Sequence, residues 1–421
     1  MRIAVIGTGI SGMASAYLAQ RAGHDITVYE AASTIGGHTR TLEVDYGGVS
    51  IAVDTGFIVF NKVNYPNLVG FFKHLGVETQ KSDMSFAISV DQGRFEWGAR
   101  SLGAVFGQRR NLLRPAFYRM IRDVMRFNKH ALHRAETSPG MTLRALLDSL
   151  KLGEDFRRYY ILPMAGAIWS APTETMLDFP AHTFVQFFKN HGLLSLTGQH
   201  QWYTVTGGSK QYVAKVTAPY RERIRTGCPV VQVTRDDAGV EITDGHGDVA
   251  RYDQVIFACH ADQTLRMLAN ATEQERVVLG AFHYQRNVAY LHRDTSVMPR
   301  RKACWASWVY RTVSQGHDET AQGIEVSYWM NLLQSIDERH PLFVTLNPAQ
   351  PINETLVFDR HVFEHPIFNN DTVRAQQALP ELQGQNRSWF CGAYTRYGFH
   401  EDGIMSAVAV ARGLGMEIPW A

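Results

Sequence analysis

The sequence predicts an α/β protein in which a nucleotide-binding domain with a parallel sheet is interleaved with a second, α+β domain. Three observations lead to this prediction. A short apolar strand, Ile3 to Ile6, runs into three closely spaced glycines and then into an Ala-rich helical stretch. A second apolar strand, Ile26 to Tyr29, ends at the acidic residue Glu30. Two later stretches contain further short strands that suit the same sheet. The expected fold is Rossmann-like.

Each glycine of the first turn has its own task. Gly7 makes the tight turn, Gly9 lets the backbone approach a pyrophosphate, and Gly12 lets helix and strand pack closely. The helix N-terminus then offers free amides to phosphates. Glu30 has the spacing of an acid that accepts hydrogen bonds from a ribose. This order favours a dinucleotide site over a glycine-rich turn without a ligand, and its predicted residues are Gly7, Gly9, Ile10, Ser11, Gly12, Glu30 and Ala31.

A second glycine pair narrows the choice of cofactor. The stretch "GGHTRT" begins six residues after Glu30, where the chain must again pass close to something bulky. An acid followed by Gly-Gly in this way resembles the FAD-dependent oxidoreductases of the amine oxidase, protoporphyrinogen oxidase and phytoene desaturase superfamily. The resemblance implies FAD as cofactor. It also implies contacts with the flavin or its phosphates from Gly37, His38, Thr39, Thr55 and Gly56.

His38 and the nearby Asp54 each need a separate interpretation. His38 stands where relatives often carry an arginine, and so it is a candidate for contact with the flavin or its phosphates. Asp54 in "VDTGFIVFN" resembles the superfamily's acid near the flavin. For Asp54 we favour the alternative, a turn-forming aspartate held by nearby backbone amides.

The predicted FAD-binding domain consists of residues 1–80, 205–270 and 385–421. Its second segment contains alternating strands, turns at 236–239 and 244–247, and a final strand from Val255 to Ala258. Its third segment is "RSWFCGAYTRYGFHEDGIMSAVAVARGLG". The resemblance implies that Val230 lies beside the adenine. It further implies that the ribityl chain and the flavin pyrimidine are covered by the strand and helix that carry Gly392, Ala393, Glu401, Gly403 and Ile404. A helix N-terminus there stabilises negative charge on a reduced flavin.

A substrate domain is predicted from the two inserts. Residues 81–204 are expected to be mostly helical, and residues 271–384 strand-rich, as in "RNVAYLHRD". Neither insert contains a second dinucleotide fingerprint. We therefore expect the electrons of reduced flavin to pass to oxygen, a quinone or another carrier.

Candidate catalytic residues lie in the last segment. Alignment on Gly403 places His400 where amine oxidases carry one of two aromatic residues that flank the amine, and Glu401 where a backbone amide meets the flavin pyrimidine. His400 would act as a base or hydrogen-bond donor, and a packing or loop-capping role is an equal alternative. Tyr394 and Tyr397 are candidates for the second aromatic residue. The lysine that usually holds a water near flavin N5 is replaced by Arg286 or Asn287.

Composition limits the function classes. The chain has 421 residues, 45% hydrophobic content and a net charge of +2, so no global field favours nucleic acid. The four cysteines lack metal-ligand or redox spacing, which predicts no metal site and suits buried thiols in a reducing compartment. No secretory signal and no run of about 18 apolar residues is visible. We expect a cytoplasmic protein.

Residues 105–134 carry eight Lys or Arg against one acid. Apolar residues recur there at helical spacing, with basic residues around much of the remaining circumference, from Arg109 to Arg134. A basic amphipathic helix is typical of a peripheral element at a membrane surface, here the inner face of the membrane. A core-packed helix with a solvated basic face is the somewhat favoured alternative. The predicted apolar face is Met120, Ile121, Val124, Met125 and Leu132.

Several further stretches narrow the resemblance. "NYPNLVGFFKHLGVETQKSDMSFAISV", "FPAHTFVQFFKNHGLL", "QWYTVTGGS" and "ACWASWVY" resemble a subgroup that includes the flavoprotein desaturase of furan fatty acid biosynthesis and the N-terminal flavin domain of plant cyclopropane fatty acid synthases. This implies dehydrogenation of a methylated or unsaturated acyl chain of a phospholipid, by proton abstraction and hydride transfer to flavin N5. Two alternatives remain open: an amine or amino-acid oxidase that releases hydrogen peroxide, and a non-catalytic flavoprotein partner of a lipid methyltransferase.

Overall fold

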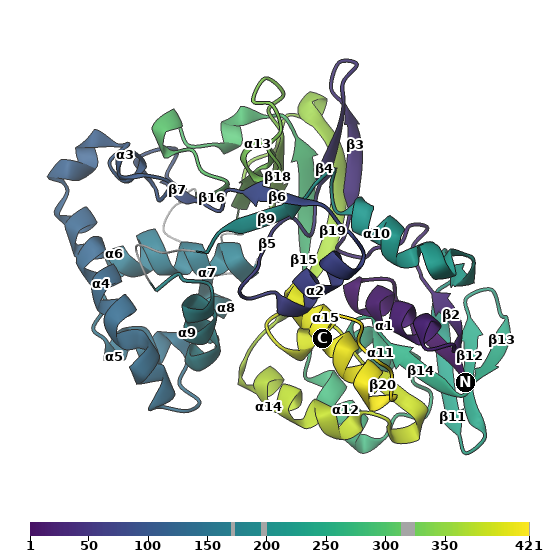
Figure 1. Ribbon diagram of the computed structural model, residues 1–421. Coiled ribbons are helices and arrows are strands. Elements are labelled where there is room, and N and C mark those ends of the chain that lie inside the picture. Colours follow the sequence, from purple (N-terminus) through teal and green to yellow (C-terminus); the bar gives the residue numbers. More distant parts are fainter. Residues whose placement is uncertain (170–172, 195–199, 313–324, 421) are drawn as a thin grey trace.

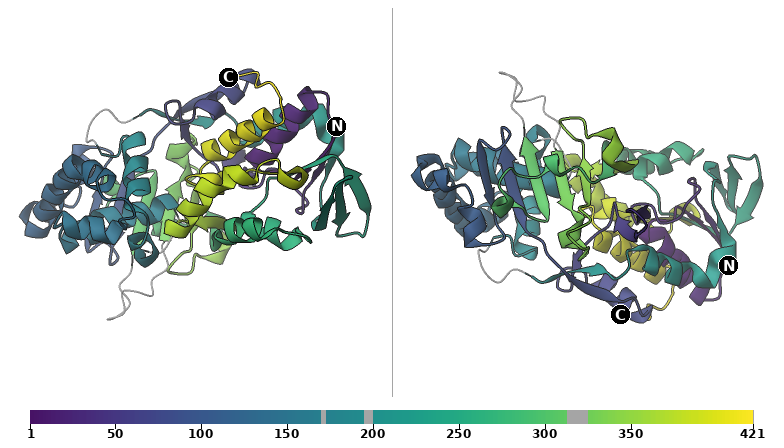
Figure 2. Two further views of the ribbon diagram at one scale, coloured as in Figure 1. Left: turned by 90° about the horizontal axis from the view of Figure 1, so that it is seen from below. Right: turned by 90° about the horizontal axis from the view of Figure 1, so that it is seen from above.

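The computed structural model describes residues 1–169, 173–194, 200–312 and 325–420. Figure 1 shows three regions: a helical end at the left, a large sheet at the upper centre, and a nucleotide-binding end at the lower right. The two further views in Figure 2 keep the helical end and the nucleotide-binding end on opposite sides of the large sheet.

The nucleotide-binding end is built on a five-stranded parallel sheet. Its strands come from three distant parts of the chain, and their order is β10 (Ile224–Arg225), β2 (Asp25–Tyr29), β1 (Arg2–Ile6), β14 (Gln254–Phe257) and β20 (Ser388–Phe390). Strand β1 lies at the centre, with Ile3 opposite both Ile26 and Gln254. The predicted α/β fold with a Rossmann-like parallel sheet is confirmed.

Both faces of this sheet are covered, which explains why β1 is continuously apolar. Ile3 and Val5 pack in one core with residues of α1 (Ile10–Arg21) and α15 (His400–Gly413). Ala4 and Ile6 pack in another. That second core includes residues of β11 (Val230–Asp236), β12 (Gly239–Asp244), β13 (Val249–Tyr252), α11 (Ala261–Met267), α12 (Glu273–Gly280) and α14 (Asn370–Ala378). The predicted turns at 236–239 and 244–247 join the three antiparallel strands.

A buried ion pair links this second core to the parallel sheet. Arg235 on β11 donates to Glu275 on α12, with Nη2 2.9 Å from Oε2, and to the Ser388 hydroxyl on β20 at 3.2 Å. Both charged side chains are about 2% exposed. Each charge is therefore satisfied only by the other and by neighbouring hydrogen bonds.

The large sheet has seven strands. Their order is β19 (Val357–Ile367), β15 (His283–His292), β18 (Phe343–Leu346), β17 (Glu325–Trp329), β16 (Trp308–Thr312), β7 (Phe86–Val90) and β8 (Phe95–Gly98). Only β16 and β7 pair in parallel, and this pairing joins the two inserts into one sheet. The boundaries of the five predicted segments stay a prediction, since strand pairing shows which segments join but not where a domain ends.

Smaller elements connect the two ends of the molecule. They are the hairpin β3 (Thr41–Asp45) and β4 (Ser50–Asp54), the sheet of β5 (Phe60–Asn61), β9 (Trp202–Val205) and β6 (Thr79–Ser82), and the helices α2 (Pro66–His74), α10 (Lys210–Thr217) and α13 (Met330–Leu333).

The helical end consists of α3 (Leu102–Val105), the 3-10 helix η1 (Arg109–Leu113), α4 (Pro115–Glu136), α5 (Leu143–Ser149), α6 (Glu154–Phe156), α7 (Leu162–Trp169), α8 (Thr173–Leu177) and α9 (Ala181–Asn190). None of the helices in the described residues is long and apolar enough to cross a bilayer.

Helix α4 is amphipathic, but its buried face differs from the predicted one. Met120 and Val124 are buried as expected, whereas Met125 is 60% exposed. The buried apolar stripe follows a 3.6-residue period along the whole helix, whereas the predicted face departs from that period after Val124. The apolar residues of the buried stripe are Phe117, Met120, Val124, Phe127, Ala131 and Ala135. The helix thus packs on the core of this end and leaves most of its arginines in solvent.

The cysteines are free thiols. Cys228, Cys304 and Cys391 are buried as expected, but Cys259 is only partly buried. It follows β14 and lines the large cavity described next.

Candidate active site

One cavity of about 1390 Å³ runs from the carboxyl end of the parallel sheet into the space between the large sheet and the helical end. It exceeds the roughly 300–1,000 Å³ of ordinary ligand pockets. Most of the predicted cofactor-binding residues line it: Gly7, Gly9, Ile10, Ser11, Glu30, Ala31, Gly37, His38, Thr39, Thr55, Gly56, Val230, Gly392 and Ala393. Residues far apart in the chain therefore meet around one space.

The three glycines at the start of α1 differ in their surroundings as predicted. Gly7 has φ +104°, and a Cβ there would lie 2.8 Å from the Ala258 carbonyl oxygen. A Cβ on Gly12 would lie 1.9 Å from the Gly7 carbonyl oxygen, so Gly12 permits the close packing of α1 on the turn. A Cβ on Gly9 meets no atom within 4 Å, because it would point into the cavity.

Glu30 follows β2 directly and lines the cavity. Its carboxylate accepts hydrogen bonds from the Thr8 amide at 3.0 Å, from the Ala32 amide at 2.8 Å, and from the Thr8 hydroxyl. A carboxylate has about four acceptor sites, so it retains capacity for a ribose hydroxyl. Thr8, which fixes the carboxylate, was not among the predicted site residues; a hydroxyl residue between the first two glycines was the available signal.

The second glycine pair crosses over the first turn. Gly37 has φ +56°, and a Cβ there would lie 3.1 Å from Gly9 Cα. His38 follows in the cavity wall, with its ring 5.0 Å from that of Phe363 and 5.3 Å from that of His365. Burial, reinforced by nearby histidines, holds the pKa of His38 well below its usual range. His38 is thus a neutral ring and does not supply the positive charge of the arginine that relatives carry.

Asp54 is fully buried and does not line the cavity. It accepts hydrogen bonds from the Ser209 amide at 2.9 Å, the Ser209 hydroxyl at 2.7 Å and the Gln334 side chain at 3.2 Å. Burial raises its pKa to about 6. The favoured interpretation holds only in part: a backbone amide does satisfy Asp54, but the residue ends strand β4 and the amide belongs to Ser209 before α10, so the expectation of a local turn was wrong.

Helix α15 brings its N-terminus to the cavity. A Cβ on Gly403 would lie 2.7 Å from Ile10 Cγ2, so Gly403 allows α15 to cross α1 closely. Gly403 and Ile404 lie behind the cavity wall with Gly12 and do not line it. The unpaired amides of the first helical turn are the part of α15 available to a ligand.

The Glu401 side chain points away from the cavity. It accepts hydrogen bonds from the Asn67 amide at 3.0 Å, the Asn67 side chain at 2.8 Å and the Leu68 amide at 2.9 Å, and so caps α2. Sequence alignment predicted a role for its backbone amide only. The side-chain role could not be found from the sequence, because its partners lie more than 330 positions away.

His400, the first residue of α15, lines the cavity. Its Nε2 lies 2.8 Å from the Tyr212 hydroxyl and 3.1 Å from the Thr39 hydroxyl, and its ring stacks on Phe57 with centroids 3.7 Å apart. Burial lowers the pKa of His400 to about 3. The imidazole is neutral at physiological pH and firmly held. Its role as a base stays a prediction, and these contacts favour the packing alternative.

The two candidate tyrosines have different surroundings. Tyr394 is buried in the core beside the parallel sheet, with its ring 4.9 Å from Phe282. Its hydroxyl has no hydrogen-bond partner among the described residues. Tyr397 lies between the cavity and the core of the helical end. Both tyrosines line the cavity, and Tyr397, whose ring lies 6.3 Å from that of Phe187, is the one beside its aromatic far end.

Asp402 fixes the loop that carries Tyr397. Its Oδ2 accepts from the Tyr397 amide at 3.2 Å and from the Phe399 amide at 2.9 Å. Burial raises the pKa of Asp402 to about 7, although these hydrogen bonds and Arg396 oppose the change. Phe399 in turn stacks on Phe187 with centroids 4.9 Å apart.

The far end of the cavity is mainly aromatic and aliphatic. None of its members was predicted as a site residue; they are Met164, Ile168, Trp169, Phe187, His191, Leu193, Trp202, Trp308, Tyr328, Leu346, Phe368 and Phe399. Burial lowers the pKa of His191 to about 4, so this histidine is also neutral.

Of the two candidates for the lysine position, Arg286 lines the cavity and Asn287 does not. Asn287 is fully buried, and its amide nitrogen lies 2.8 Å from Nδ1 of His365. Arg286 lies opposite Glu364 in the pairing of β15 with β19, and both residues line the cavity.

The fold and the cavity define a class of protein, one in which a Rossmann-like dinucleotide site continues into a largely apolar cavity. Comparison with known proteins defines the family. The family model described as flavin containing amine oxidoreductase matches residues 10–291. The chain belongs to this family.

Individual relatives agree with this assignment. The chain is 26% identical to amine oxidase B of Homo sapiens, a flavin-containing enzyme, over 267 residues, which are 59% of this chain and 49% of that protein. It thus spans about half the length of this curated relative.

Two solved structures share the fold over nearly the whole chain. One is a CLA-producing fatty acid isomerase from P. acnes, with a TM-score of 0.69, 14% identity and 98% of both chains covered. Another is cyclohexylamine oxidase from Brevibacterium oxydans IH-35A, with a TM-score of 0.67, 16% identity, and coverage of 98% of this chain and 99% of that one.

The protein is an FAD-dependent oxidoreductase. The residues fit FAD: open space beside Gly9 suits a pyrophosphate, Glu30 retains acceptor sites for a ribose, and the first turn of α15 faces the same cavity. When bound, FAD accepts a hydride equivalent from the substrate. The chain itself supplies orientation, an apolar compartment and neutral histidines.

Proposed function

We propose that this enzyme dehydrogenates a methylated or unsaturated fatty acyl chain, carried by a membrane phospholipid. The observation that supports this most directly is the far end of the cavity, where aromatic and aliphatic side chains from the helical end and the large sheet surround a space continuous with the cofactor residues. An acyl chain has no polar groups along its length, so it suits a mainly apolar lining. Two polar atoms of that lining, the indole nitrogens of Trp169 and Trp308, are buried without a hydrogen-bond partner among the described residues.

The distribution of acids also supports an apolar substrate. Among the described residues that line the cavity, the carboxylates are Glu30 and Glu364. Glu30 is held at the cofactor end, and Glu364 lies 3.5 Å from Nδ1 of His260. Neither lies among the aromatic residues, so a substrate ammonium group would find no counter-charge there. The fatty acid isomerase of similar fold makes an acyl substrate compatible with this architecture.

Dehydrogenation of a C–C bond removes one hydride equivalent and one proton, and leaves a double bond. The hydride equivalent and its electron pair leave with the cofactor, and an acceptor such as oxygen or a quinone then reoxidises it. The proton needs an acceptor in the protein or in solvent. His400 is the candidate in the cavity wall, and a proton there would be shared with the Tyr212 hydroxyl, 2.8 Å from Nε2.

The test is anaerobic spectroscopy of the flavin. Purified enzyme is mixed with phospholipid whose acyl chains are monounsaturated or methyl-branched, and the visible flavin absorption is followed. The proposal expects bleaching, followed by recovery when an acceptor is added. An unbleached flavin with every such lipid and acceptor would refute it.

Variants of the cavity wall test the role of His400. His400→Ala should keep FAD and slow reduction more than about 100-fold if the ring accepts the proton. The matched variant Tyr212→Phe keeps its ring and removes only the hydroxyl, so it should change the pH dependence of reduction more than the binding of substrate. A mild effect of His400→Ala would return the residue to a packing role.

An amine substrate is the second candidate, because the family and the human relative are amine oxidases. Release of hydrogen peroxide on addition of an amine panel would favour it. A third candidate is a non-catalytic flavoprotein that presents lipid to a methyltransferase. Co-purification with such an enzyme, together with a flavin that no lipid reduces, would favour the third.

A further inference from the structure

The helical end carries an unusual group of exposed leucines. Among the described residues, the leucines with large exposed side chains are Leu102 at 81%, Leu112 at 47% and Leu113 at 87%. All three lie on residues 102–113, which comprise α3 and η1 and are called the leucine turn below. Tyr118 at the start of α4 is also exposed, and its hydroxyl donates to the Leu112 carbonyl at 3.0 Å.

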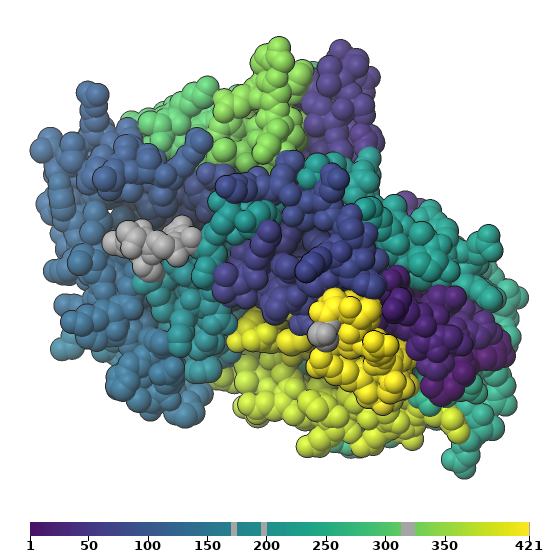
Figure 3. All heavy atoms as spheres, in the orientation of Figure 1, coloured from purple at the N-terminus to yellow at the C-terminus, as the bar shows by residue number. Residues whose placement is uncertain are grey.

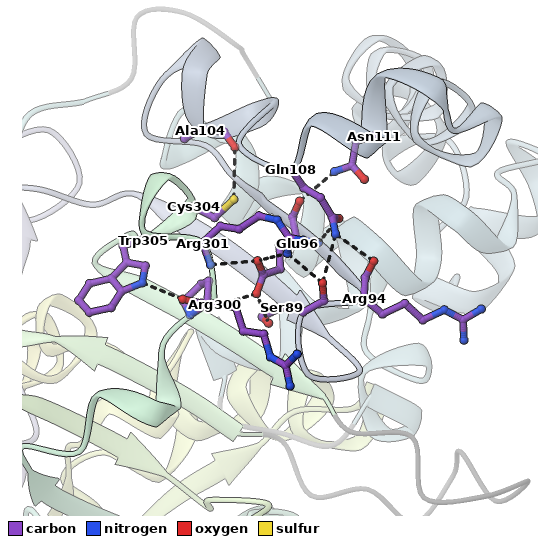
Figure 4. Close-up of polar contacts among 12 residues, drawn as sticks. Ser89, Arg94, Glu96, Ala104, Gln108, Asn111, Arg300, Arg301, Cys304 and Trp305 are labelled. Atoms are coloured by element: carbon purple, nitrogen blue, oxygen red, sulfur yellow. Dashed lines mark hydrogen bonds and ion pairs between the residues drawn. The ribbon is translucent and has the colours of Figure 1, made fainter.

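The leucine turn is anchored by buried polar groups (Figure 4). The Glu96 amide donates to Gln108 Oε1 at 2.9 Å, and Asn111 Nδ2 donates to the Glu96 carbonyl at 2.8 Å. Gln108 Nε2 also reaches the carbonyls of Gly93 and Arg94, both at 3.1 Å. Glu96, Gln108 and Asn111 are almost completely buried. These bonds fix η1 on strand β8, so its leucines are held outward rather than exposed by a loose loop.

The Glu96 carboxylate links the leucine turn to further parts of the large sheet. It accepts from Arg301 Nη1 at 2.8 Å, from the Arg300 amide at 2.8 Å and from the Ser89 hydroxyl at 2.9 Å (Figure 4). The carboxylate is fully buried and therefore depends on these partners. Strands β7 and β8, the segment before β16, and η1 are thus joined at one point.

The surface around the leucine turn is basic. Arg109 and Arg110 are exposed on the turn itself, and within the described residues neither has a carboxylate at ion-pair distance. Along α4 more basic side chains are exposed, and Asp123, the acid between Arg109 and Arg134, is buried against the Gly153 amide at 2.9 Å. With the histidines taken as neutral, every exposed charged side chain on residues 105–134 is therefore positive.

We propose that the leucine turn docks the enzyme on an anionic phospholipid membrane. Leu102, Leu112 and Leu113 enter the boundary between headgroups and acyl chains, while Arg109 and Arg110 lie at the phosphates. In Figure 3 the blue part of the chain, which includes this turn, projects at the left edge of the molecule. This docking gives the proposed lipid substrate a route to the enzyme, but vesicle binding requires no turnover.

The exposure of the leucines favours a bilayer over a protein partner. The Leu113 side chain is 87% exposed and so contacts little of the rest of the protein. It therefore protrudes from the surface instead of forming part of a flat patch. A fluid bilayer closes around a protruding side chain, whereas a protein partner would need a matching pocket. The unbalanced positive charge around the turn complements an anionic surface.

The experiment measures co-sedimentation of the flavin-loaded enzyme with vesicles. One set contains phosphatidylcholine alone and another contains phosphatidylcholine with phosphatidylglycerol. The wild type should bind the second set and release it as salt rises. The variant L102S/L112S/L113S should lose at least about tenfold in partitioning, and R109Q/R110Q should bind the two vesicle sets with less preference.

The control is V277S, which removes an apolar side chain that is 64% exposed on α12 at the nucleotide-binding end. It should bind vesicles as the wild type does. Flavin content and melting temperature establish that each variant is folded. Equal partitioning of the leucine variant and the wild type would overturn the proposal, as would a wild type that ignores both vesicle sets. A leucine variant that changes only the oligomeric state would instead identify a contact between two copies of the chain, and would also overturn it.

The same variant separates docking from catalysis. With lipid dispersed in detergent, L102S/L112S/L113S should reduce its flavin as fast as the wild type does. If the proposed reaction is wrong, neither protein will be reduced, although the difference in vesicle binding will remain. If docking alone is wrong, both will be reduced and both will partition equally.

Discussion

Gly9→Ala should separate the stability of the chain from its capacity to hold FAD. Gly9 has φ −64° and ψ 179°, a backbone conformation that alanine adopts without strain. A Cβ there meets no protein atom within 4 Å and points into the cavity where the cofactor phosphates are expected. The new methyl group therefore collides with the ligand and with nothing else.

The two effects have opposite signs. Without cofactor, alanine in place of glycine at a compatible position stabilises a protein by about 0.4–1 kcal/mol, because the unfolded chain loses freedom. With cofactor at 100 times its Kd, the wild type gains about 2.7 kcal/mol from binding, and the variant loses this gain. The flavin-free variant should thus melt at or slightly above the temperature of the flavin-free wild type, and added FAD should raise the melting temperature of the wild type alone.

The assay combines visible absorption of the purified proteins with thermal melts in the presence and absence of FAD. Gly280→Ala is the control, because its Cβ would meet only Leu265 at 3.7 Å, far along the chain from the fingerprint. Gly12→Ala provides the contrast, since its Cβ would overlap the Gly7 carbonyl and should lower the melting temperature even without cofactor. Full flavin occupancy in Gly9→Ala would refute this assignment of the pyrophosphate site.

Three further predictions concern buried groups. Glu275→Ala should lower the free energy of unfolding by about 3–5 kcal/mol in urea denaturation, because it leaves Arg235 buried and unpaired; a loss below 1 kcal/mol would contradict this. The pKa of Asp402 is raised to about 7 in the folded state against about 3.9 unfolded, so its contribution to stability is greatest below pH 4 and is lost as pH rises to 7. Asp402→Asn should therefore gain stability relative to wild type over that range, and a pH-independent difference would argue against the assignment. Phe399→Ala should raise KM with little change in flavin content, since Phe399 stacks on Phe187 at the substrate end; flavin loss would place it at the cofactor instead.

Features defined by neighbours in sequence could be predicted. The glycines of the first turn, Glu30 and the strand at Val255 depend on local spacing, and the structure has each where it was expected. The amphipathic character of α4 was also predictable from its periodicity. Assigning Met125 to its buried face was wrong, because composition alone does not fix which of two adjacent stripes meets the core.

Features made by distant segments could not be predicted. Glu401 caps a helix more than 330 positions away, and Asp54 is held by Ser209 and Gln334. The aromatic end of the cavity likewise joins Phe187 to Phe399, and no local pattern relates these two residues. The neutral state of His400 follows from burial, which depends on the completed fold.

The parallel sheet also determines the order in which the protein is able to fold on the ribosome. Ile3 on β1 pairs with Gln254 on β14, and β14 must then pair with β20, close to the end of the chain. At a synthesis rate of about 5–20 residues per second, the apolar edge of β1 waits roughly ten seconds or more for its partner β14 to be made. The helix that completes the cofactor site, α15, is made later still. FAD is therefore captured only after α15 has been made, and production of the protein should depend on chaperones that shield its first strand until then.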